Sequence, residues 1–289
     1  MDAARRIELS LSSQLQRCDV STCPKGLREA MWHAVMPAGS RVRPKLSLAV
    51  ALACGDPCPE AADAAAAAIE LIHCASLVHD DLPCFDDAAV RRGRPSVHAA
   101  YGERLAVLAG DALIIMAFEC VATGAAPAPD RMAALIQIIA AASGGARGIT
   151  AGQAWECEPR VDVSAYHRLK TGELFAAATA AGAAAAGENP KVWRLLGDRL
   201  GEAYQIADDL RDVLGKESEM GKPAGRDADL GRPTAVCELG VDGAVARVRH
   251  LIDGAIQSIP PCAGAAELRA LVLEQARRVV PRELTLVAA

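Results

Sequence analysis

Two clusters of acidic residues have a spacing that suits metal and phosphate chemistry. The first reads HDDLPCFDD (residues 79–87) and directly follows an apolar segment with helical spacing. The second reads QIADDLRD (residues 205–212), in which Asp208 and Asp212 are four apart and share one helix face. Carboxylates this close repel one another unless a cation lies between them, and Mg²⁺ takes one or two carboxylates together with phosphate oxygens. The clusters therefore indicate two halves of a metal–phosphate site.

Basic residues follow both clusters. Arg91, Arg92 and Arg94 come after the first, and Lys216 and Lys222 come after the second. A single acidic cluster is also compatible with a solvated helix end. Two clusters, each in or after an apolar segment and each followed by cations, favour a site that binds a diphosphate through metal ions and basic side chains.

The composition predicts a helical protein, and the length fits one large domain or two small ones with room for a large buried core. The chain has 289 residues, of which 52% are apolar and 23% charged, and alanine and leucine dominate over β-branched residues. A net charge of −5 gives no basic footprint for nucleic acid. The longest apolar stretch, residues 174–187, is shorter than the about 20 residues that a membrane span needs, and the N-terminus has no apolar signal core. We therefore expect a cytoplasmic protein without a membrane span, whose ten cysteines are free thiols, several of them buried, as at Cys74, Cys120 and Cys237.

Apolar periodicity predicts seven helical segments that position these clusters. They are expected at residues 62–80, 111–121, 131–142, 163–186, 192–214, 242–257 and 265–278. Pro83 is expected to end the first of them, which places the first acidic cluster at a helix terminus. The glycine-rich residues 144–148 lack the spacing of a phosphate-binding loop and are expected to be a helix break.

The two clusters resemble the two aspartate-rich motifs of the trans-type polyprenyl diphosphate synthases. Further matches follow in family order over roughly residues 35–235: Gly39-Ser40-Arg41-Val42-Arg43-Pro44, Ala109-Gly110-Asp111, Gly152-Gln153, Lys170-Thr171-Gly172 and Gly221-Lys222. The chain is most similar to bacterial geranylgeranyl diphosphate synthases of carotenoid biosynthesis. The resemblance implies an all-α, single-domain helical bundle of the isoprenoid synthase type over residues 1–289, around a deep central cavity.

The same resemblance implies an activity. The enzyme would join isopentenyl diphosphate head-to-tail to an allylic diphosphate (dimethylallyl, geranyl or farnesyl), releasing diphosphate and forming geranylgeranyl diphosphate. Three Mg²⁺ ions are expected, with Mn²⁺ as a substitute, and a homodimer. Three alternatives stay open: a synthase with a farnesyl or longer product, a class I terpene cyclase, and a non-catalytic regulatory subunit. The second motif argues against a cyclase, and the presence of both motifs argues against a regulatory subunit.

The resemblance also assigns roles residue by residue. The residues expected to bind metal are Asp80, Asp81 and Asp86 on one side and Asp208 and Asp212 on the other. Those expected at the allylic diphosphate are Arg91, Lys170 and Lys222, with Thr171 and Gln205 beside them. Those expected at isopentenyl diphosphate are Arg43, His73 and Arg92, with Arg41 close by. Catalysis would rest on the first four of these aspartates, Asp80, Asp81, Asp86 and Asp208, and on Lys170. His73 is also compatible with a core histidine, and Arg41 and Arg43 with surface charges.

Product length is expected to depend on the helix that precedes the first cluster. Ala75 and Ser76, five and four residues before Asp80, would line a tunnel for the growing chain. Farnesyl diphosphate synthases of bacteria carry an aromatic residue at the position of Ala75, so alanine predicts a longer product. The expected floor residues are Phe118 and Trp155, with Ile72 and Met116 as lesser candidates.

The chain departs from the family pattern in three places, at four positions. Ser40 replaces a usual lysine and removes one phosphate contact. Ala88 and Ala89 replace two aspartates that are expected to lie beyond the metal ligands. Arg232 replaces a lysine and keeps the charge.

Overall fold

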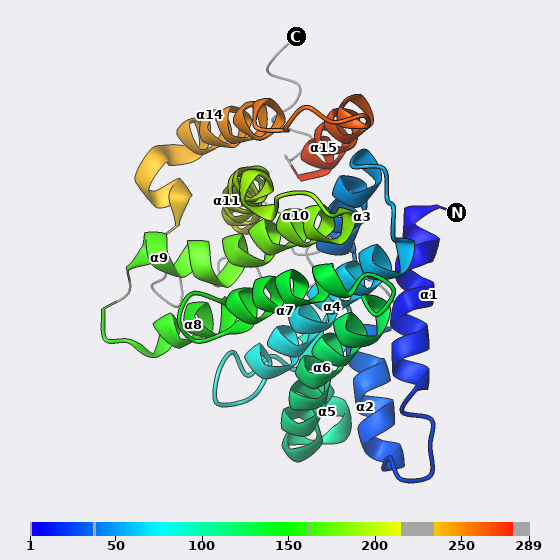
Figure 1. Cartoon of the computed structure of the whole chain (residues 1–289). Helices are drawn as coiled ribbons and strands as arrows, with labels where there is room; N and C mark the ends of the chain where they lie inside the picture. The colour runs from blue at the N-terminus through cyan, green and yellow to red at the C-terminus, as the bar shows by residue number, and fades with distance from the viewer. Residues whose placement is uncertain (1, 37–38, 161, 215–233, 280–289) are drawn as a thin grey trace.

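The structure, a computed structural model, describes residues 2–36, 39–160, 162–214 and 234–279, and these are almost entirely helical (Figure 1). The helices are α1 (Ala3–Gln16), α2 (Lys25–Val35), α3 (Val42–Ala53), α4 (Pro59–Asp80), α5 (Val97–Tyr101), α6 (Glu103–Gly124), α7 (Pro129–Ser143), α8 (Ile149–Ala154), the 3₁₀ turn η1 (Trp155–Cys157), α9 (Val163–His167), the π-helical η2 (Arg168–Gly172), α10 (Glu173–Ala186), α11 (Pro190–Leu214), α14 (Ala235–Gln257) and α15 (Ala265–Val279). A short antiparallel hairpin, β1 (Val90–Arg91) and β2 (Arg94–Pro95), interrupts them. The predicted all-α class is confirmed.

Two alanine-rich helices form the centre of the bundle. All 14 residues of α10 are buried, and α10 packs against α3, α4, α7 and α11 (Figure 1). Small side chains let these backbones approach closely: a Cβ added at Gly182 would lie 2.2 Å from the carbonyl oxygen of Ser47 in α3. α4 packs against both α10 and α6, and its C-terminal turn also contacts α8 through Gln153 and α6 through His79. This packing fixes the position of the first aspartate cluster.

The predicted helices are present in the structure, but several of their first and last residues differ from the prediction. α6 begins at Glu103, so its predicted start at Asp111 is wrong; Gly102, with a φ of 84°, separates α6 from α5. The segment predicted as one helix over 163–186 divides into α9, η2 and α10. α14 begins at Ala235, earlier than predicted, with a kink at Gly240, where φ is 67°. The break predicted at 144–148 separates α7 from α8.

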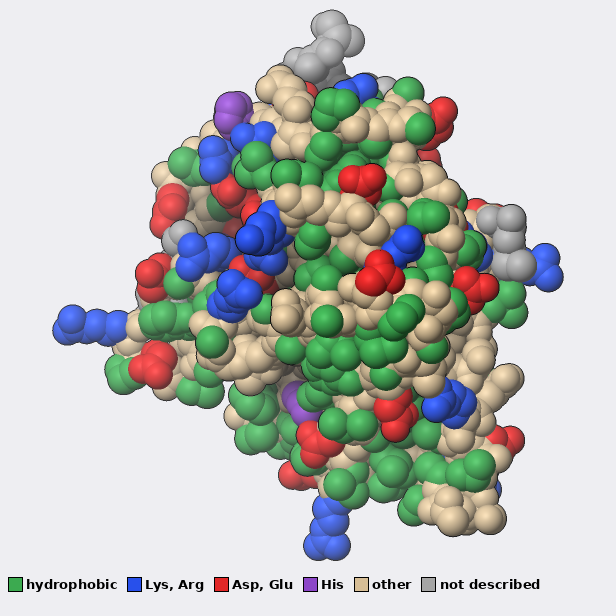
Figure 2. All heavy atoms as spheres, viewed as in Figure 1, with side chains coloured by type: hydrophobic (Ala, Val, Ile, Leu, Met, Phe, Trp, Pro, Cys, Tyr) green, Lys and Arg blue, Asp and Glu red, His purple; other side chains and the backbone are tan. Residues whose placement is uncertain are grey.

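α4 and α6 are each long and apolar enough, by length and composition, to cross a membrane. For α4, 83% of the apolar window is buried inside the fold, which makes it a core helix. For α6 the figure is 44%. Its exposed face carries the apolar residues Val107, Leu108 and Ile115, with the exposed Asp111 among them, and hydrophobic side chains gather over α6 and α7 in Figure 2.

All ten cysteines are free, as expected for this chain. Cys74 and Cys120 are buried as predicted, whereas Cys237 is exposed. The prediction for Cys237 is wrong because the first turn of α14 lies ahead of the Gly240 kink and presents that side to solvent.

Candidate active site

The first aspartate cluster is built on the C-terminus of α4. The loop that follows folds back onto this end: the Asp86 amide donates to the Asp80 carbonyl (2.9 Å), and the Ala88 amide donates to the Asp81 carbonyl (3.1 Å). Asp80 and Asp81 are only 6% and 2% exposed. Burial raises the pKa of both carboxyl groups, and the neighbouring Asp86 adds to the rise. Negative charges crowded in this way provide a place for a cation.

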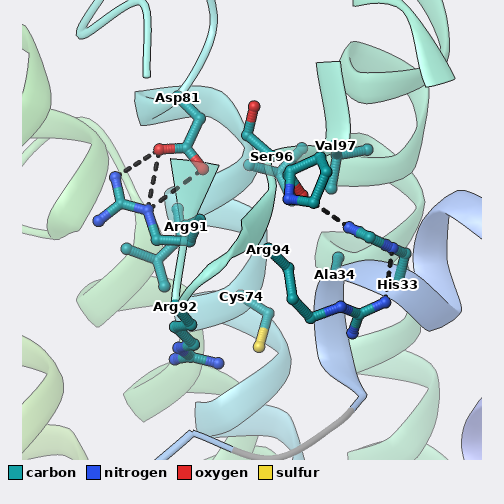
Figure 3. A pocket seen from close by; sticks show the side chains of 12 residues that line it. His33, Ala34, Cys74, Asp81, Arg91, Arg92, Arg94, Ser96 and Val97 are labelled. Atoms are coloured by element: carbon teal, nitrogen blue, oxygen red, sulfur yellow. Dashed lines mark hydrogen bonds and ion pairs between the residues drawn. The ribbon is translucent and has the colours of Figure 1, made fainter. Parts of the chain in front are cut away.

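Basic or amide groups contact each of the two buried carboxylates. The Asp80 Oδ2 atom lies 3.3 Å from the Lys170 Nζ atom, and its Oδ1 atom accepts a hydrogen bond from Gln153 Nε2 (2.9 Å). Asp81 forms a two-nitrogen ion pair with Arg91, which Figure 3 shows across the start of the hairpin. These contacts oppose the effect of burial on the two pKa values without reversing it.

The second cluster lies near the end of α11 and divides by role. Asp208 is 57% exposed along its side chain and pairs with Arg211 at 2.7 Å. Asp209 is buried and accepts hydrogen bonds from Gln205 Nε2 (3.0 Å) and from the Ala235 amide (2.9 Å), so it joins α11 to α14. Asp212 is buried, and its Oδ1 atom has no hydrogen-bond partner within the described ranges.

The π-helix η2 connects the two clusters through consecutive residues. Lys170 contacts Asp80 from the first cluster, and the Thr171 hydroxyl donates to the Gln205 Oε1 atom (2.7 Å), one turn before Asp208. Single turns of π-helix occur often at functional sites. The structure thus brings together Asp80, Lys170, Thr171 and Gln205, four of the residues expected at the site.

Gly152 explains how η2 is held against α8. A Cβ at Gly152 would lie 2.3 Å from the Lys170 amide nitrogen and 2.5 Å from its Cα atom. Only glycine lets the two backbones touch here, because real Cβ contacts do not reach these distances. The next residue, Gln153, reaches both the Asp80 carboxylate and the Ser76 carbonyl of α4. The Gly152-Gln153 pair therefore positions both Lys170 and Asp80.

The donor set fits a hard divalent cation that also binds substrate. The candidate ligands are carboxylate oxygens, and one of them, on Asp212, is buried without a partner in the part of the chain that is described. Within that part, no three His, Cys, Asp or Glu side chains converge as a ready-made metal cage. Mg²⁺ in phosphate-transfer sites takes one or two carboxylates and completes its shell with phosphate oxygens and water. The residues present fit that mode of binding.

A second group of cations lies around His73. The Arg43 Nη1 atom is 3.4 Å from His73 Nε2, and the guanidinium lies 4.7 Å from the centroid of the Phe175 ring. Burial, and then the charges of Arg43 and Arg92, hold the pKa of His73 well below its ordinary value. His73 is therefore neutral at pH 7. The Arg43 Nε and His73 Nδ1 atoms are buried without partners in the described structure, as expected for groups that await a polar ligand.

Arg92 borders the same region from the hairpin. Its guanidinium packs against Gly39, where an added Cβ would lie 2.5 Å from the Arg92 Cζ atom. Arg92 also lines the cavity of Figure 3, between α2, α4 and the hairpin, together with Asp81 and Arg91. A larger cavity of about 900 Å³ lies between η2, α11 and α14 and reaches Gly172 and Gln205. One cavity therefore opens beside Asp81 of the first cluster, and the other reaches Gln205 at the start of the second.

The structure corrects the expectation for Arg41. Its residue is only 4% exposed, and its guanidinium donates to Glu8 (2.9 Å), Glu70 (2.7 Å) and the Val35 carbonyl (2.7 Å). All three guanidinium nitrogens are engaged in these contacts, so Arg41 ties α1, α2 and α4 together. These contacts make Arg41 a structural residue; the nearby Arg43 remains the arginine expected at isopentenyl diphosphate.

Replacing Arg41 with methionine is expected to lower the free energy of unfolding by about 3–5 kcal/mol, because Glu70 would be left buried and unpaired. Urea denaturation measures this loss. Lys25→Met, which breaks the exposed pair with Glu29, is the matched control and should cost less than about 1 kcal/mol. An Arg41→Met protein of unchanged stability but weakened isopentenyl diphosphate binding would restore the substrate role.

The remaining predicted residues have these places. Ala75 and Ser76 are 1% and 6% exposed, one helical turn before Asp80. The lesser floor candidates Ile72 and Met116 are buried. Phe118 is partly buried against the main core, and Trp155 is half-buried in η1. Lys216, Lys222 and Arg232 lie outside the described residues.

Sequence reasoning missed Glu156. Its Oε1 atom accepts from the Lys170 ammonium and from the Tyr166 hydroxyl (2.5 Å). The available signal was spacing: Glu156 stands three residues after Gln153, one helical turn on, so both share a face.

Comparisons with known proteins agree with this arrangement. The family model described as polyprenyl synthetase matches residues 24–264. A geranylgeranyl diphosphate synthase of Cereibacter sphaeroides is 52% identical over 97% of both chains, and that of Rhodobacter capsulatus is 50% identical over the same share of each. The farnesyl diphosphate synthase of Escherichia coli is 38% identical over 80% of this chain and 81% of its own length.

Solved structures show the same fold. The crystal structure of an FPP/GFPP synthase from Zymomonas mobilis has a TM-score of 0.80 and 32% identity over 95% of both chains. The geranylgeranyl pyrophosphate synthetase of Pyrococcus horikoshii has a TM-score of 0.80 and 29% identity over 96% of this chain and 98% of its own. The fold is thus the all-α isoprenoid synthase fold. The chain belongs to the polyprenyl synthetase family, whose members use divalent metal ions in catalysis.

Proposed function

We propose that this protein is a magnesium-dependent geranylgeranyl diphosphate synthase, which condenses isopentenyl diphosphate with an allylic diphosphate. The observation that carries the proposal is the joining of the two aspartate clusters by Lys170 and Thr171, with arginines paired to Asp81 and Asp208. Carboxylates that could bind metal ions and basic side chains that could bind phosphate therefore lie next to one another. Two relatives named for this activity are at least 50% identical over nearly the whole chain.

The metal ions, which we take to be three Mg²⁺, would be held by Asp80, Asp81 and Asp86 on one side and by Asp208 and Asp212 on the other. When bound, they supply positive charge to the departing diphosphate as the allylic C–O bond ionises. Arg91 and Lys170, which contact carboxylates in this structure, would then donate hydrogen bonds to the same diphosphate. Lys222, outside the described residues, would act with them.

Isopentenyl diphosphate would bind at the second group of cations, around His73 of α4. Arg43 and Arg92 supply two permanent charges, and neutral His73 supplies a hydrogen bond from the Nδ1 side of its ring. The Phe175 ring lies against the Arg43 guanidinium and limits its directions. This holds the isopentenyl double bond near the allylic cation, while the released diphosphate takes the proton that the product loses. Water has to be excluded, because it would quench the cation.

Arg92→Ala and His73→Ala are expected to raise the KM for isopentenyl diphosphate by about tenfold and that for the allylic substrate by less, since a charge-assisted hydrogen bond typically contributes about that much. Arg91→Ala and Lys170→Ala should do the reverse, because these side chains lie on Asp81 and Asp80. Initial rates with each substrate varied in turn measure the split. Equal effects on both substrates across all four variants would contradict the assignment of separate binding residues to the two diphosphates.

The product length follows from the absence of a ring at position 75. Ala75 is buried one turn from the aspartates, on the helix along which the tail is expected to grow. A methyl group leaves space that an aromatic side chain would fill. This supports geranylgeranyl diphosphate over farnesyl diphosphate as the product.

We also propose that the protein works in the cytoplasm as a homodimer. The uncovered apolar face of α6 at Val107, Leu108 and Ile115 is where a second copy would pack (Figure 2). Sedimentation of the purified protein tests this, and a monomer at micromolar concentration would contradict it.

The test of the activity is turnover by the purified protein alone. With isopentenyl diphosphate, farnesyl diphosphate and Mg²⁺ present, diphosphate should be released continuously, and excess EDTA should stop its release. A protein that is inactive alone and active only with a second synthase would instead be a regulatory subunit.

A further inference from the structure

The Lys170 ammonium lies between two carboxylates, of which the proposed chemistry uses one. Asp80 Oδ2 is 3.3 Å away on one side, and Glu156 Oε1 is in closer contact on the other. The side chains of Lys170, Asp80 and Glu156 are 19%, 9% and 14% exposed, so solvent screens the two ion pairs only weakly. Glu156 is therefore a second negative partner for a lysine that is placed at the diphosphate.

Tyr166 holds Glu156 in place. Its hydroxyl donates to the same Glu156 Oε1 atom at 2.5 Å, and its ring centroid is 5.6 Å from the Lys170 ammonium. Tyr166 is itself 9% exposed. Lys170, Glu156 and Tyr166 come from η2, η1 and α9, three short elements that meet beside α8. The contact thus joins the three short segments to one another.

Both oxygens of Asp80 are occupied in the free protein. Gln153 donates to Oδ1 at 2.9 Å, and Lys170 lies on Oδ2. A metal ion that binds an Asp80 oxygen places a second positive charge beside the Lys170 ammonium. The metal ion repels the Lys170 ammonium, so Lys170 is the partner that moves away from Asp80. Gln153 carries no charge, and its amide is also held by the Ser76 carbonyl.

We propose that Glu156 is a positioning residue that keeps Lys170 in the site when a metal ion takes Asp80. This rests on the proposed function. By giving the ammonium a fixed second partner, Glu156 lowers the cost of its release from Asp80. The lysine then stays beside the carboxylates, where its remaining donors face the diphosphate that arrives with the metal. Glu156 and Tyr166 thereby couple metal binding to diphosphate binding.

Glu156→Gln is expected to weaken the binding of Mn²⁺ about tenfold when inorganic pyrophosphate is present, because Lys170 would then have only Asp80 as a charged partner and compete harder for it. Tyr166→Phe keeps the ring and removes the hydroxyl, so its effect should be in the same direction and about threefold. Isothermal titration measures both without turnover. Glu158→Gln, an exposed glutamate two residues further on, is the matched control and should change binding less than twofold.

A double-mutant cycle with Lys170→Met separates this role from a direct one. If Glu156 acts through Lys170, both Glu156→Gln and Tyr166→Phe should change Mn²⁺ binding less than twofold in the Lys170→Met background. An unchanged tenfold effect in that background would show that Glu156 acts on the metal itself, and no effect in either background would show that it only packs; both results overturn the inference. Should Glu156→Gln fail to fold, as judged by thermal unfolding, the Tyr166→Phe cycle decides alone.

The same titration distinguishes failure of the inference from failure of the proposed function. Wild-type protein should bind Mn²⁺ with pyrophosphate, and Asp80→Ala should abolish that binding. If the wild type binds neither, or if Asp80→Ala binds normally, the metal–diphosphate site is absent. If those two results are as expected and the Lys170 cycle shows no coupling, only the role of Glu156 is wrong.

Discussion

Alanine in place of Asp80 or Asp208 is expected to lower kcat by about 10²-fold or more, the usual loss when one preorganised electrostatic contact is removed from a transition state. Asp80 is buried at the end of α4, and Asp208 is exposed near the end of α11, so each variant removes an expected ligand from a different aspartate cluster. Steady-state rates at saturating substrate and Mg²⁺ measure the loss. Full turnover by either variant, or by the wild type in excess EDTA, would contradict the metal site.

The fold should tolerate Asp80→Ala, so a lower kcat of this variant can be attributed to the reaction and not to unfolding. Burial raises the pKa of Asp80, so the folded state binds its proton more tightly than the unfolded state does. The ionised carboxylate therefore costs stability at pH values above the ordinary 3.8, and its removal relieves that cost. Asp130→Ala, at a side chain that is 80% exposed on α7, is the control and should leave both kcat and stability unchanged.

Phenylalanine in place of Ala75 is expected to change the main product from geranylgeranyl to farnesyl diphosphate. Ala75 is 1% exposed in a close-packed helix, so a ring placed there fills the space next to the site instead of turning to solvent. No charged contact is altered, so ionisation and condensation should continue. Chromatography of the hydrolysed products measures the shift.

A matched control separates tunnel blocking from simple overpacking. Ala66 is fully buried on the same helix, nine residues earlier, which at 100° per residue is the opposite face. Ala66→Phe should destabilise the fold and leave the product unchanged. A stable, active Ala75→Phe enzyme that still makes mainly geranylgeranyl diphosphate would move the floor of the tunnel to Phe118 or Trp155.

The elements that position the site were predictable where periodicity is strong. The end of α4 followed from apolar spacing and Pro83, and the α11 segment followed in the same way. The helices α1, α2 and α3 were not predicted, since the first two are more polar and α3 follows Arg41, whose left-handed φ of 52° carries no sequence signature. The π-helical η2 was also missed, because its backbone is fixed by the contact with Gly152 and not by local propensity.

The site residues divide in a similar way. Charged residues within short motifs, such as Asp80 and Lys170, could be found because their chemistry and spacing are visible in one dimension. Arg41 and Glu156 could not be assigned, because their roles depend on partners that lie far away in the sequence or on other short elements. Glu8 and Glu70 make Arg41 structural, and Tyr166 with Lys170 makes Glu156 part of the site.

The most direct test of the central claim is the chain length of the product made by the purified wild-type enzyme. The protein is incubated with Mg²⁺, isopentenyl diphosphate and, in separate reactions, dimethylallyl, geranyl or farnesyl diphosphate. The products are then hydrolysed and separated by chromatography. The account predicts that geranylgeraniol is the main alcohol from each starter. Farnesol as the end product, longer alcohols as the main products, or no condensation at all would contradict it.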